Sequence, residues 1–254
     1  MSNIAERRKY ILESITEKGF VKVADLATAL GVTQTTIRKD LSALEEKGVL
    51  YRAYGSAMTS TAPVLDVNLN TKRLFHFNEK QRIGAKAAEL IAENDSIIVS
   101  AGSTMGVFAE NIKPKGRLSV VTPAVNVSML LGDMTGVNVM QLGGILYGNS
   151  MCVTGGEAIS QLQHLRCTKV FFGVDGVDPK LGASCATPEE AAMTHKMIEV
   201  CSKVIVLADS SKIGFAGFGH ICEAGEIDIL VTDGGITPEQ KKAFEAQGVQ
   251  VIVC

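Results

Sequence analysis

The sequence lacks any apolar run near the roughly 20 residues that a membrane-spanning helix needs. Its opening residues, MSNIAERRKY, also lack the apolar segment of a secretion signal. These absences predict a cytoplasmic protein without a membrane partner. The composition, 46% hydrophobic and 20% charged residues, is typical of a folded chain that buries a sizeable core.

Closely spaced cysteines are missing too. No two cysteines have C-x-x-C spacing, and the four histidines do not cluster with them. The scatter argues against a metal site or a disulfide framework, and it favours reduced, mostly buried thiols. We therefore expect no metal and no cofactor. The six cysteines are Cys152, Cys167, Cys185, Cys201, Cys222 and Cys254.

No strong excess of one charge marks the chain, whose formal net charge is −2. The balance differs along its length, because residues 1–60 hold nine Lys or Arg against seven Asp or Glu, whereas the remainder holds sixteen against twenty. The mild positive excess of the first part permits nucleic-acid binding there without proving it.

The first sixty residues have the apolar spacing of three helices, followed by a basic hairpin at 49–57. Gly31 is expected to end the second helix, and Thr33 to cap the third. The inward-facing positions are Ile11, Leu12 and Ile15 in the first helix, Leu26, Ala27 and Leu30 in the second, and Ile37, Leu41 and Leu44 in the third. This order predicts a winged helix-turn-helix domain.

Polar residues occupy the outer face of the third helix near its start, where recognition helices contact base edges. Gln34 suits adenine, Arg38 suits guanine, and Thr35 offers a hydroxyl or a methyl group. Lys39, the two flanking threonines and the hairpin suit the DNA backbone. Taken alone, the helix reads equally well as a solvated surface helix, and its neighbours favour DNA. The predicted DNA-binding residues are Thr33, Gln34, Thr35, Thr36, Arg38, Lys39, Arg52 and Tyr54.

Asp40 also lies on this helix and would repel phosphate if it faced DNA. We expect it to be structural and paired with an Arg or Lys of the same domain, although the pattern does not identify that residue.

A polar, proline-containing stretch follows the hairpin and predicts a linker at 58–78, between a DNA-binding domain at 1–57 and a second domain at 79–254. Short apolar runs alternate with helical segments in the second domain, which is typical of an α/β fold with a mostly parallel sheet. The runs are 96–102, 118–124, 137–144, 169–176, 203–211, 228–235 and 249–254.

Small and polar residues follow several of these runs. Open α/β sheets bind ligands beyond the carboxyl ends of their strands. The Ser100–Gly106 loop before a helix suits an anion, Lys212 suits a phosphate, and Asp175 suits sugar hydroxyls. Asp209 and Asp233 end two other runs. The predicted effector-binding residues are Ser100, Gly102, Ser103, Thr104, Thr122, Gly143, Gly144, Asp175 and Lys212.

The stretch from Gly19 to Ala57 resembles the N-terminal signature of the DeoR family of bacterial transcription regulators, and it departs at Ser56, where members often have glycine. The matching residues are Val23, Leu26, Ala27, Gly31, Val32, Thr36, Ile37, Arg38, Asp40, Leu41, Leu44, Gly48, Leu50, Arg52 and Gly55. The resemblance continues through NEKQRIGAKAAELI, DSIIVSAGSTMG, VVTPAVNV, LGG, FFGVDGVD and VIVLADSSKIG.

This resemblance implies a Rossmann-like sensor domain, similar to ribose-5-phosphate isomerase, that binds a sugar or polyol phosphate. Ser100 and Pro123 stand where members commonly have Asp and Asn, which removes two polar groups from the expected pocket. Members also often have a Lys-Arg pair after the glutamates of the helical segment PEEAAMTHKMIEV, where this chain has Thr194-His195-Lys196. Glu190 and Lys196 are candidates for the pocket rim, and His195 reads as a surface residue.

Together these features predict a DNA-binding transcriptional regulator, a repressor of a sugar or polyol operon that binds double-stranded operator DNA as a dimer or tetramer. The alternative is a sugar-phosphate isomerase-like enzyme with an added DNA-binding-like domain. Because the residues of such catalysis are missing, we expect no enzyme. A third hypothesis is a DNA-binding protein that binds no ligand and uses its α/β domain only for oligomerisation.

Overall fold

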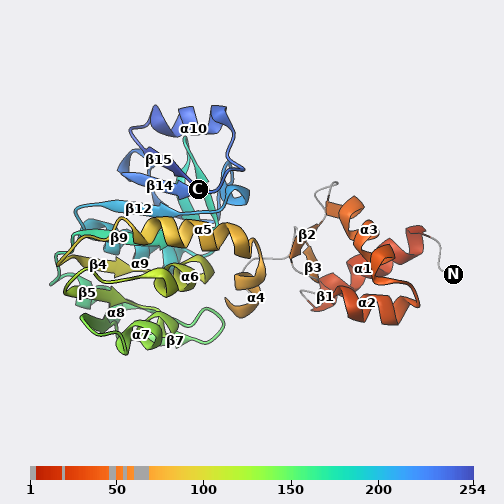
Figure 1. The fold of residues 1–254 in the computed structure, drawn as a ribbon, viewed down its shortest axis with the longest axis horizontal. Coiled ribbons are helices and arrows are strands. Elements are labelled where there is room, and N and C mark those ends of the chain that lie inside the picture. Colours follow the sequence, from red (N-terminus) through yellow and green to blue (C-terminus); the bar gives the residue numbers. More distant parts are fainter. Residues whose placement is uncertain (1–3, 19–20, 46–49, 54–55, 60–68) are drawn as a thin grey trace. The chain divides into compact units, whose positions relative to one another are not determined.

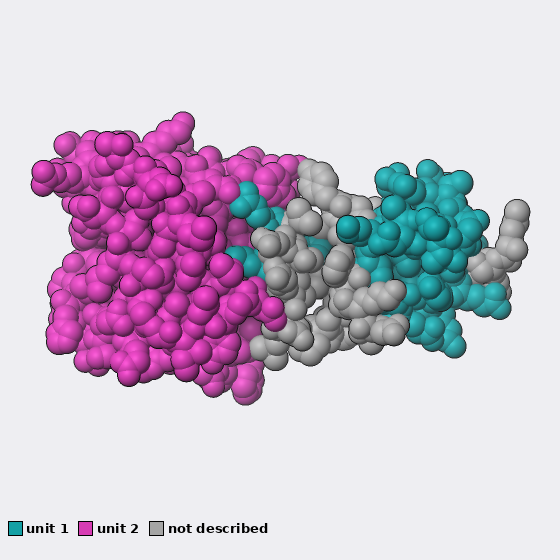
Figure 2. All heavy atoms as spheres, turned by 90° about the horizontal axis from the view of Figure 1, so that it is seen from below, with its two compact units in different colours: residues 1–75 teal, residues 76–254 magenta. Residues whose placement is uncertain are grey.

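The computed structural model describes residues 4–18, 21–45, 50–53, 56–59 and 69–254. The chain forms two compact units, residues 1–75 and residues 76–254, which Figure 2 shows in different colours. Each unit has its own hydrophobic core. Of the predicted linker at 58–78, residues 60–68 lie outside the described residues, and Leu69–Leu74 form the short helix α4.

The N-terminal unit contains three helices and a small sheet. The helices are α1 (Ile4–Lys18), α2 (Val23–Leu30) and α3 (Gln34–Glu45), and the strands are β1 (Val21–Lys22), β2 (Leu50–Ala53) and β3 (Ser56–Thr59). Strand β3 pairs with both other strands in antiparallel fashion. The helices bury apolar side chains together, among them Ile11, Ile15, Leu26, Ile37 and Leu41. The predicted winged helix-turn-helix fold is confirmed.

The turn between α2 and α3 is fixed by local hydrogen bonds. Gly31 has a φ of 61°, in the left-handed region that glycine adopts without strain. The N–H of Val32 donates to the carbonyl of Ala27 at 3.1 Å. The hydroxyl of Thr33 accepts from the N–H of Thr36 at 3.2 Å, which satisfies a backbone donor at the start of α3. The turn therefore sets where α3 begins.

The second unit is built on a seven-stranded sheet in the order β15-β14-β12-β9-β4-β5-β6, and all neighbouring strands are parallel. Each of the seven predicted runs supplies one strand, so the predicted parallel α/β sheet is confirmed. The strands are β4 (Ser96–Val99), β5 (Leu118–Thr122), β6 (Val137–Gln141), β9 (Lys169–Gly173), β12 (Val204–Leu207), β14 (Ile229–Thr232) and β15 (Gln250–Val253).

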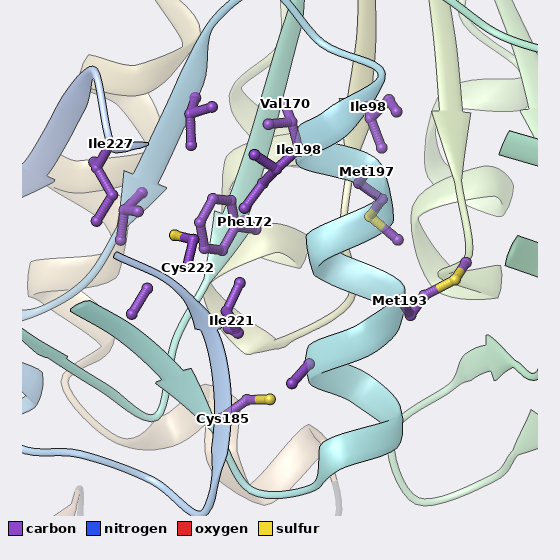
Figure 3. Close-up of a cluster of buried hydrophobic side chains, with 14 of the residues drawn as sticks. Ile98, Val170, Phe172, Cys185, Met193, Met197, Ile198, Ile221, Cys222 and Ile227 are labelled. Carbon is purple, nitrogen blue, oxygen red and sulfur yellow. The ribbon is translucent and has the colours of Figure 1, made fainter. Parts of the chain in front are cut away.

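Helices cover both faces of this sheet (Figure 1). Helices α5 (Phe77–Ala88), α6 (Ser103–Asn111) and α7 (Val125–Gly132) pack on one face, where the rings of Phe108 and Phe171 stack 4.6 Å apart. Helices α8 (Gly156–Leu162), α9 (Pro188–Glu199) and α10 (Pro238–Glu245) pack on the other. Figure 3 shows Ile198 of α9 beside Phe172 in this second core. Phe171 and Phe172 pack on opposite faces of the sheet, because successive side chains of a strand point to opposite faces.

The sheet has a topological switch point. From β4 the chain adds β5 and then β6 in one direction, and it then returns to place β9, β12, β14 and β15 on the other side of β4. The strand order therefore reverses between β4 and β9. In open α/β sheets, the crevice at such a reversal is where ligands bind.

Two smaller β-structures complete the unit. Strands β10 (Gly176–Asp178), β11 (Gly182–Cys185) and β13 (Gly219–Cys222) form an antiparallel sheet, and β7 (Ile145–Tyr147) pairs with β8 (Cys152–Thr154). The sequence did not predict these strands, which are only three or four residues long.

Candidate functional sites

Helix α3 presents a polar outer face near its N-terminus. Ile37, Leu41 and Leu44 are 0–5% exposed, which fixes the helix with this stripe turned inward. On the opposite side of the helix Thr36 is half-buried and five residues are exposed, namely Thr33, Gln34, Thr35, Arg38 and Lys39. The structure therefore brings six of the eight predicted DNA-binding residues to one helix start.

The two side chains best suited to reading bases are neighbours on this face. Nη2 of Arg38 donates a hydrogen bond to Oε1 of Gln34 at 3.2 Å, across one helical turn. This hydrogen bond holds the Arg38 guanidinium and the Gln34 amide together in the absence of DNA. Of the two predicted wing residues, Arg52 lies in β2, where its backbone is opposite Ala57, and Tyr54 lies outside the described residues.

Asp40 is buried behind this face and joins α3 to α1. Its carboxylate accepts hydrogen bonds from Nε of Arg7 and, at 3.1 Å, from Nε of Arg8. The bond to Asp40 raises the pKa of Arg7 above its ordinary value. The expectation that Asp40 is structural is confirmed, and its partners are two arginines of α1. Sequence reasoning missed both arginines, because only the fold brings positions 7 and 40 together.

In the second unit, the loop after β4 lies at the switch point. The N–H of Ser100 donates to the carbonyl of Phe171 at 3.0 Å, which fixes the loop against β9. Gly102, with a φ of 129°, precedes α6, and no side chain caps this helix. Ser103 is half-buried and Thr104 is buried in the first turn. Uncapped helix starts that follow a small-residue loop favour anions.

The loops after β9 and β12 lie side by side. Val177 forms a parallel bridge with Ile213, and the N–H of Gly214 donates to the carbonyl of Val177 at 2.9 Å. A Cβ on Gly176 would lie 2.4 Å from the carbonyl oxygen of Phe215, so this close approach requires glycine. The backbone segments that carry the predicted residues Asp175 and Lys212 are thus neighbours at the carboxyl edge of the sheet.

Lys212 ends a 3-10 helix at Ser210–Lys212, and its side chain is half-buried. Two buried carboxylates shape this turn. Asp209 accepts from the N–H of Ser211 at 3.2 Å, and Asp233 accepts from the N–H of Ser210 at 2.6 Å. Burial alone would raise the pKa of Asp233, but hydrogen bonds from Ser210 and Gly235 lower it on balance. A carboxylate at this position is therefore charged at neutral pH and holds the loop that presents Lys212.

The remaining predicted effector residues lie near β5, β7 and β8, where several already have structural partners. Thr122 is buried and accepts from the N–H of Ala124 at 3.0 Å. The N–H of Gly143 donates to Gln161 at 3.1 Å. Gly144 has a φ of 148°, and a Cβ there would lie 2.8 Å from the carbonyl of Thr154. The effector role of these three residues stays a prediction.

Residues of α9 were candidates for the pocket rim. Lys196 pairs with Glu199 at 2.7 Å on the same helix. Nδ1 of His195 lies 2.9 Å from the carbonyl of Ile221, with its ring partly exposed. These contacts give both side chains a structural partner on the helix surface. Glu190 lies in the first turn of α9, where its N–H donates to the capping hydroxyl of Thr187 at 3.2 Å.

Across the described residues, no group of three or more His, Cys, Asp or Glu side chains has the arrangement of a metal site. Within the same ranges, none of the helices is both long enough and apolar enough to cross a bilayer.

A winged helix-turn-helix unit, joined in one chain to an α/β unit whose sheet has a topological switch point, defines a DNA-binding regulator with a sensor domain. The family model described as "DeoR-like helix-turn-helix domain" matches residues 7–62, and the "DeoR C terminal sensor domain" matches residues 76–234. The chain belongs to the DeoR family of transcriptional regulators.

Relatives span nearly the whole chain. The chain is 31% identical to the HTH-type transcriptional regulator YulB of Bacillus subtilis, covering 98% of this chain and 96% of the relative. It is 30% identical to the lactose phosphotransferase system repressor of Staphylococcus epidermidis, covering 94% and 96%. It is 29% identical to the HTH-type transcriptional repressor GlcR of Bacillus subtilis, covering 98% and 95%. These names are those of regulators, which agrees with the expectation of a regulator over an enzyme.

Among solved structures, ribose 5 phosphate isomerase A from Neisseria gonorrhoeae aligns with a TM-score of 0.39 and 20% identity, covering 60% of this chain and 58% of the isomerase. The initiation factor subunit eIF2B beta from Chaetomium thermophilum aligns with a TM-score of 0.40 and 16% identity, covering 59% and 47%. The chain thus spans little more than half of the first and less than half of the second. Scores this low carry no conclusion about activity.

Proposed function

We propose that this protein represses a sugar- or polyol-utilisation operon, binds operator DNA through α3, and is released by a phosphorylated sugar or polyol at the carboxyl edge of the seven-stranded sheet. The observation that best supports this proposal is the paired Gln34 and Arg38 on an exposed helix start that is locked from behind by its apolar stripe. One relative bears the name of a lactose phosphotransferase system repressor, which fits a sugar-linked operon.

On the DNA side, Arg38 and Gln34 read base edges, while Lys39, Thr33 and Thr36 contact phosphates. Replacing Arg38 with alanine is expected to cost about 1–3 kcal/mol of operator binding and to relax specificity at one position. The matched change Lys39→Ala weakens all sequences alike and reduces the salt dependence. Fluorescence anisotropy with operator and scrambled duplexes measures both effects. Unchanged operator affinity in Arg38→Ala would remove this residue from base reading.

On the effector side, the uncapped start of α6 receives the phosphate together with Lys212, and Asp175 accepts from sugar hydroxyls. Ser100 and Gly102 of the preceding loop, and Ser103 and Thr104 in the first turn of α6, complete the phosphate site. A thermal-shift screen against sugar and polyol phosphates tests this assignment, because a ligand at 100 times its dissociation constant stabilises its protein by about 2.7 kcal/mol. If no such compound raises the melting temperature, the assignment fails.

The two activities belong to separate parts of the chain in this proposal: a DNA-binding domain at 1–57, a linker at 58–78 and a sensor domain at 79–254. The effector acts by changing how strongly the first domain engages DNA. Coupling of this kind is typically about 1–3 kcal/mol.

The regulator acts as a homo-oligomer, a dimer or a tetramer, because one recognition helix reads only a few base pairs. Residues 118–156 contain a single charged residue, Asp133. Strand β6 lies within this range and is an edge strand of the seven-stranded sheet. Exposed apolar side chains gather on α7, β6 and β7, namely Met129, Leu130, Met140, Ile145, Leu146 and Tyr147. An uncharged apolar surface does not repel a copy of itself, so it suits a symmetric contact between two chains.

This contact is tested by analytical ultracentrifugation. Ile145→Lys places two like charges in a two-fold interface and is expected to shift the protein toward monomer. Leu181→Lys is the matched control, since Leu181 is similarly exposed, at 58% against 67%, but lies outside this surface. An Ile145→Lys protein that associates as strongly as the control would place the contact elsewhere.

A further inference from the structure

Two cysteines face each other at the amino ends of β9 and β12. Cys167 and Cys201 are paired as an isolated parallel bridge. The N–H of Cys167 donates to the carbonyl of Val200 at 2.8 Å, and the N–H of Ser202 donates to the carbonyl of Cys167 at 3.1 Å. Neighbouring strands lie about 4.8 Å apart, which falls within the Cα separation of about 4.4–6.8 Å that disulfides span.

Interaction between the two thiols lowers the pKa of Cys167 and raises that of Cys201. A hydrogen bond with the Ser96 side chain also lowers the pKa of Cys167. Two cysteines that are paired across neighbouring strands need little backbone movement to reach bonding distance.

Cys167, whose pKa is lowered, differs from two other buried cysteines of the unit. Burial raises the pKa of Cys152 and that of Cys222 to about 12, so these thiols stay protonated and unreactive at neutral pH. Cys201, by contrast, is only partly buried, which leaves a route for a small reagent. Both members of the pair are free thiols in this structure.

We propose that Cys167 and Cys201 form a redox-modification site, a dithiol that a small-molecule disulfide such as oxidised glutathione converts to an intramolecular disulfide. One protein thiolate attacks a sulfur of the reagent, breaks its S–S bond and releases one thiolate. The second protein thiol loses its proton, attacks the protein-bound sulfur of the mixed disulfide and releases the other. Two electrons pass from the cysteines to the reagent, and the two protons end on the released thiols.

The site lies at the amino ends of the strands, whereas the proposed effector site lies at their carboxyl ends. The disulfide closes the segment from Cys167 to Cys201, which contains β9, Asp175 and α9. The segment closed by the disulfide therefore carries Asp175, a residue proposed to bind the effector, and contains no residue of α3. The site stands independently of the proposed function, because it depends only on the two thiols.

The test uses the full chain, incubated with oxidised glutathione, quenched with acid, alkylated with N-ethylmaleimide under denaturing conditions and digested with trypsin. The expected product is a linked pair of peptides, Cys167–Lys169 and Met197–Lys203, which dithiothreitol separates. Free thiols fall by two of the six. Cys152→Ser keeps the linked peptide and Cys167→Ser loses it. The proposal is overturned if wild-type protein yields both peptides alkylated, or yields Cys201 bound to glutathione while Cys167 is alkylated.

Discussion

Replacing Asp40 with asparagine removes the charge that compensates two arginines while keeping the shape of the side chain. The side chain of Asp40 is 4% exposed and that of Arg7 is 10% exposed, so this pair is buried, whereas Arg8 is 29% exposed. Breaking a buried pair by removing one partner costs about 3–5 kcal/mol, because an uncompensated charge remains in the interior. We expect a loss in this range for Asp40→Asn, most of it from Arg7.

The matched control is Glu13→Gln, which removes the partner of Lys9 on the same helix α1. That pair is 3.8 Å apart and its side chains are 76% and 64% exposed, so its loss should cost no more than about 0.5 kcal/mol. Urea unfolding followed by far-ultraviolet circular dichroism measures both, since the chain has no tryptophan for fluorescence. Hydrogen exchange in α1 and α3 localises the effect. If Asp40→Asn is no less stable than Glu13→Gln, the structural role of Asp40 is refuted.

Three further predictions concern the second unit. Lys212→Ala should leave operator affinity unchanged and blunt the response to a sugar phosphate in the same anisotropy assay; a normal response would place the phosphate elsewhere. Gly176→Ala should destabilise the protein by about 1–3 kcal/mol in urea, because its Cβ would lie 2.4 Å from Phe215, whereas Gly148→Ala, with nothing within 4 Å, should not. Burial alone would raise the pKa of Asp95, but hydrogen bonds from Lys169, Ala92 and Thr168 lower it below 3.8. Its contribution to stability is therefore present above that value and lost as the pH falls through the folded-state pKa, so Asp95→Asn should flatten the decline of the unfolding free energy between about pH 5 and pH 2.

The elements that follow from the sequence are those with local signals. The inward stripe Ile37, Leu41 and Leu44 fixes the orientation of α3, and the Gly31 turn fixes its start, so the outer face was predictable. The seven buried strands are short apolar runs, and each was recognised from its own residues. Residue patterns of this kind reflect local propensity and burial, which act within a few positions along the chain.

What the sequence does not contain is the pairing of distant positions. The partners of Asp40 lie 33 and 32 residues away in α1. The small β10-β11-β13 sheet consists of short strands, and its Gly176 and Gly219 closely approach the distant residues Phe215 and Thr187. Gly143 and Gly144 were predicted to bind the effector, but the sequence did not predict the hydrogen bond of Gly143 to Gln161 or the close approach of Gly144 to Thr154, because both depend on residues farther along the chain.

In the proposed mechanism, an anion bound at the carboxyl edge of the sheet changes how tightly α3 binds DNA. The most direct measurement is the affinity for duplexes from the promoter neighbourhood of its own gene, at fixed modest salt, with and without the sugar or polyol phosphate that most stabilises the protein. We expect a change of about 5–150-fold, which corresponds to typical allosteric coupling. An affinity that is the same with and without that compound, at saturating concentration, would contradict this mechanism.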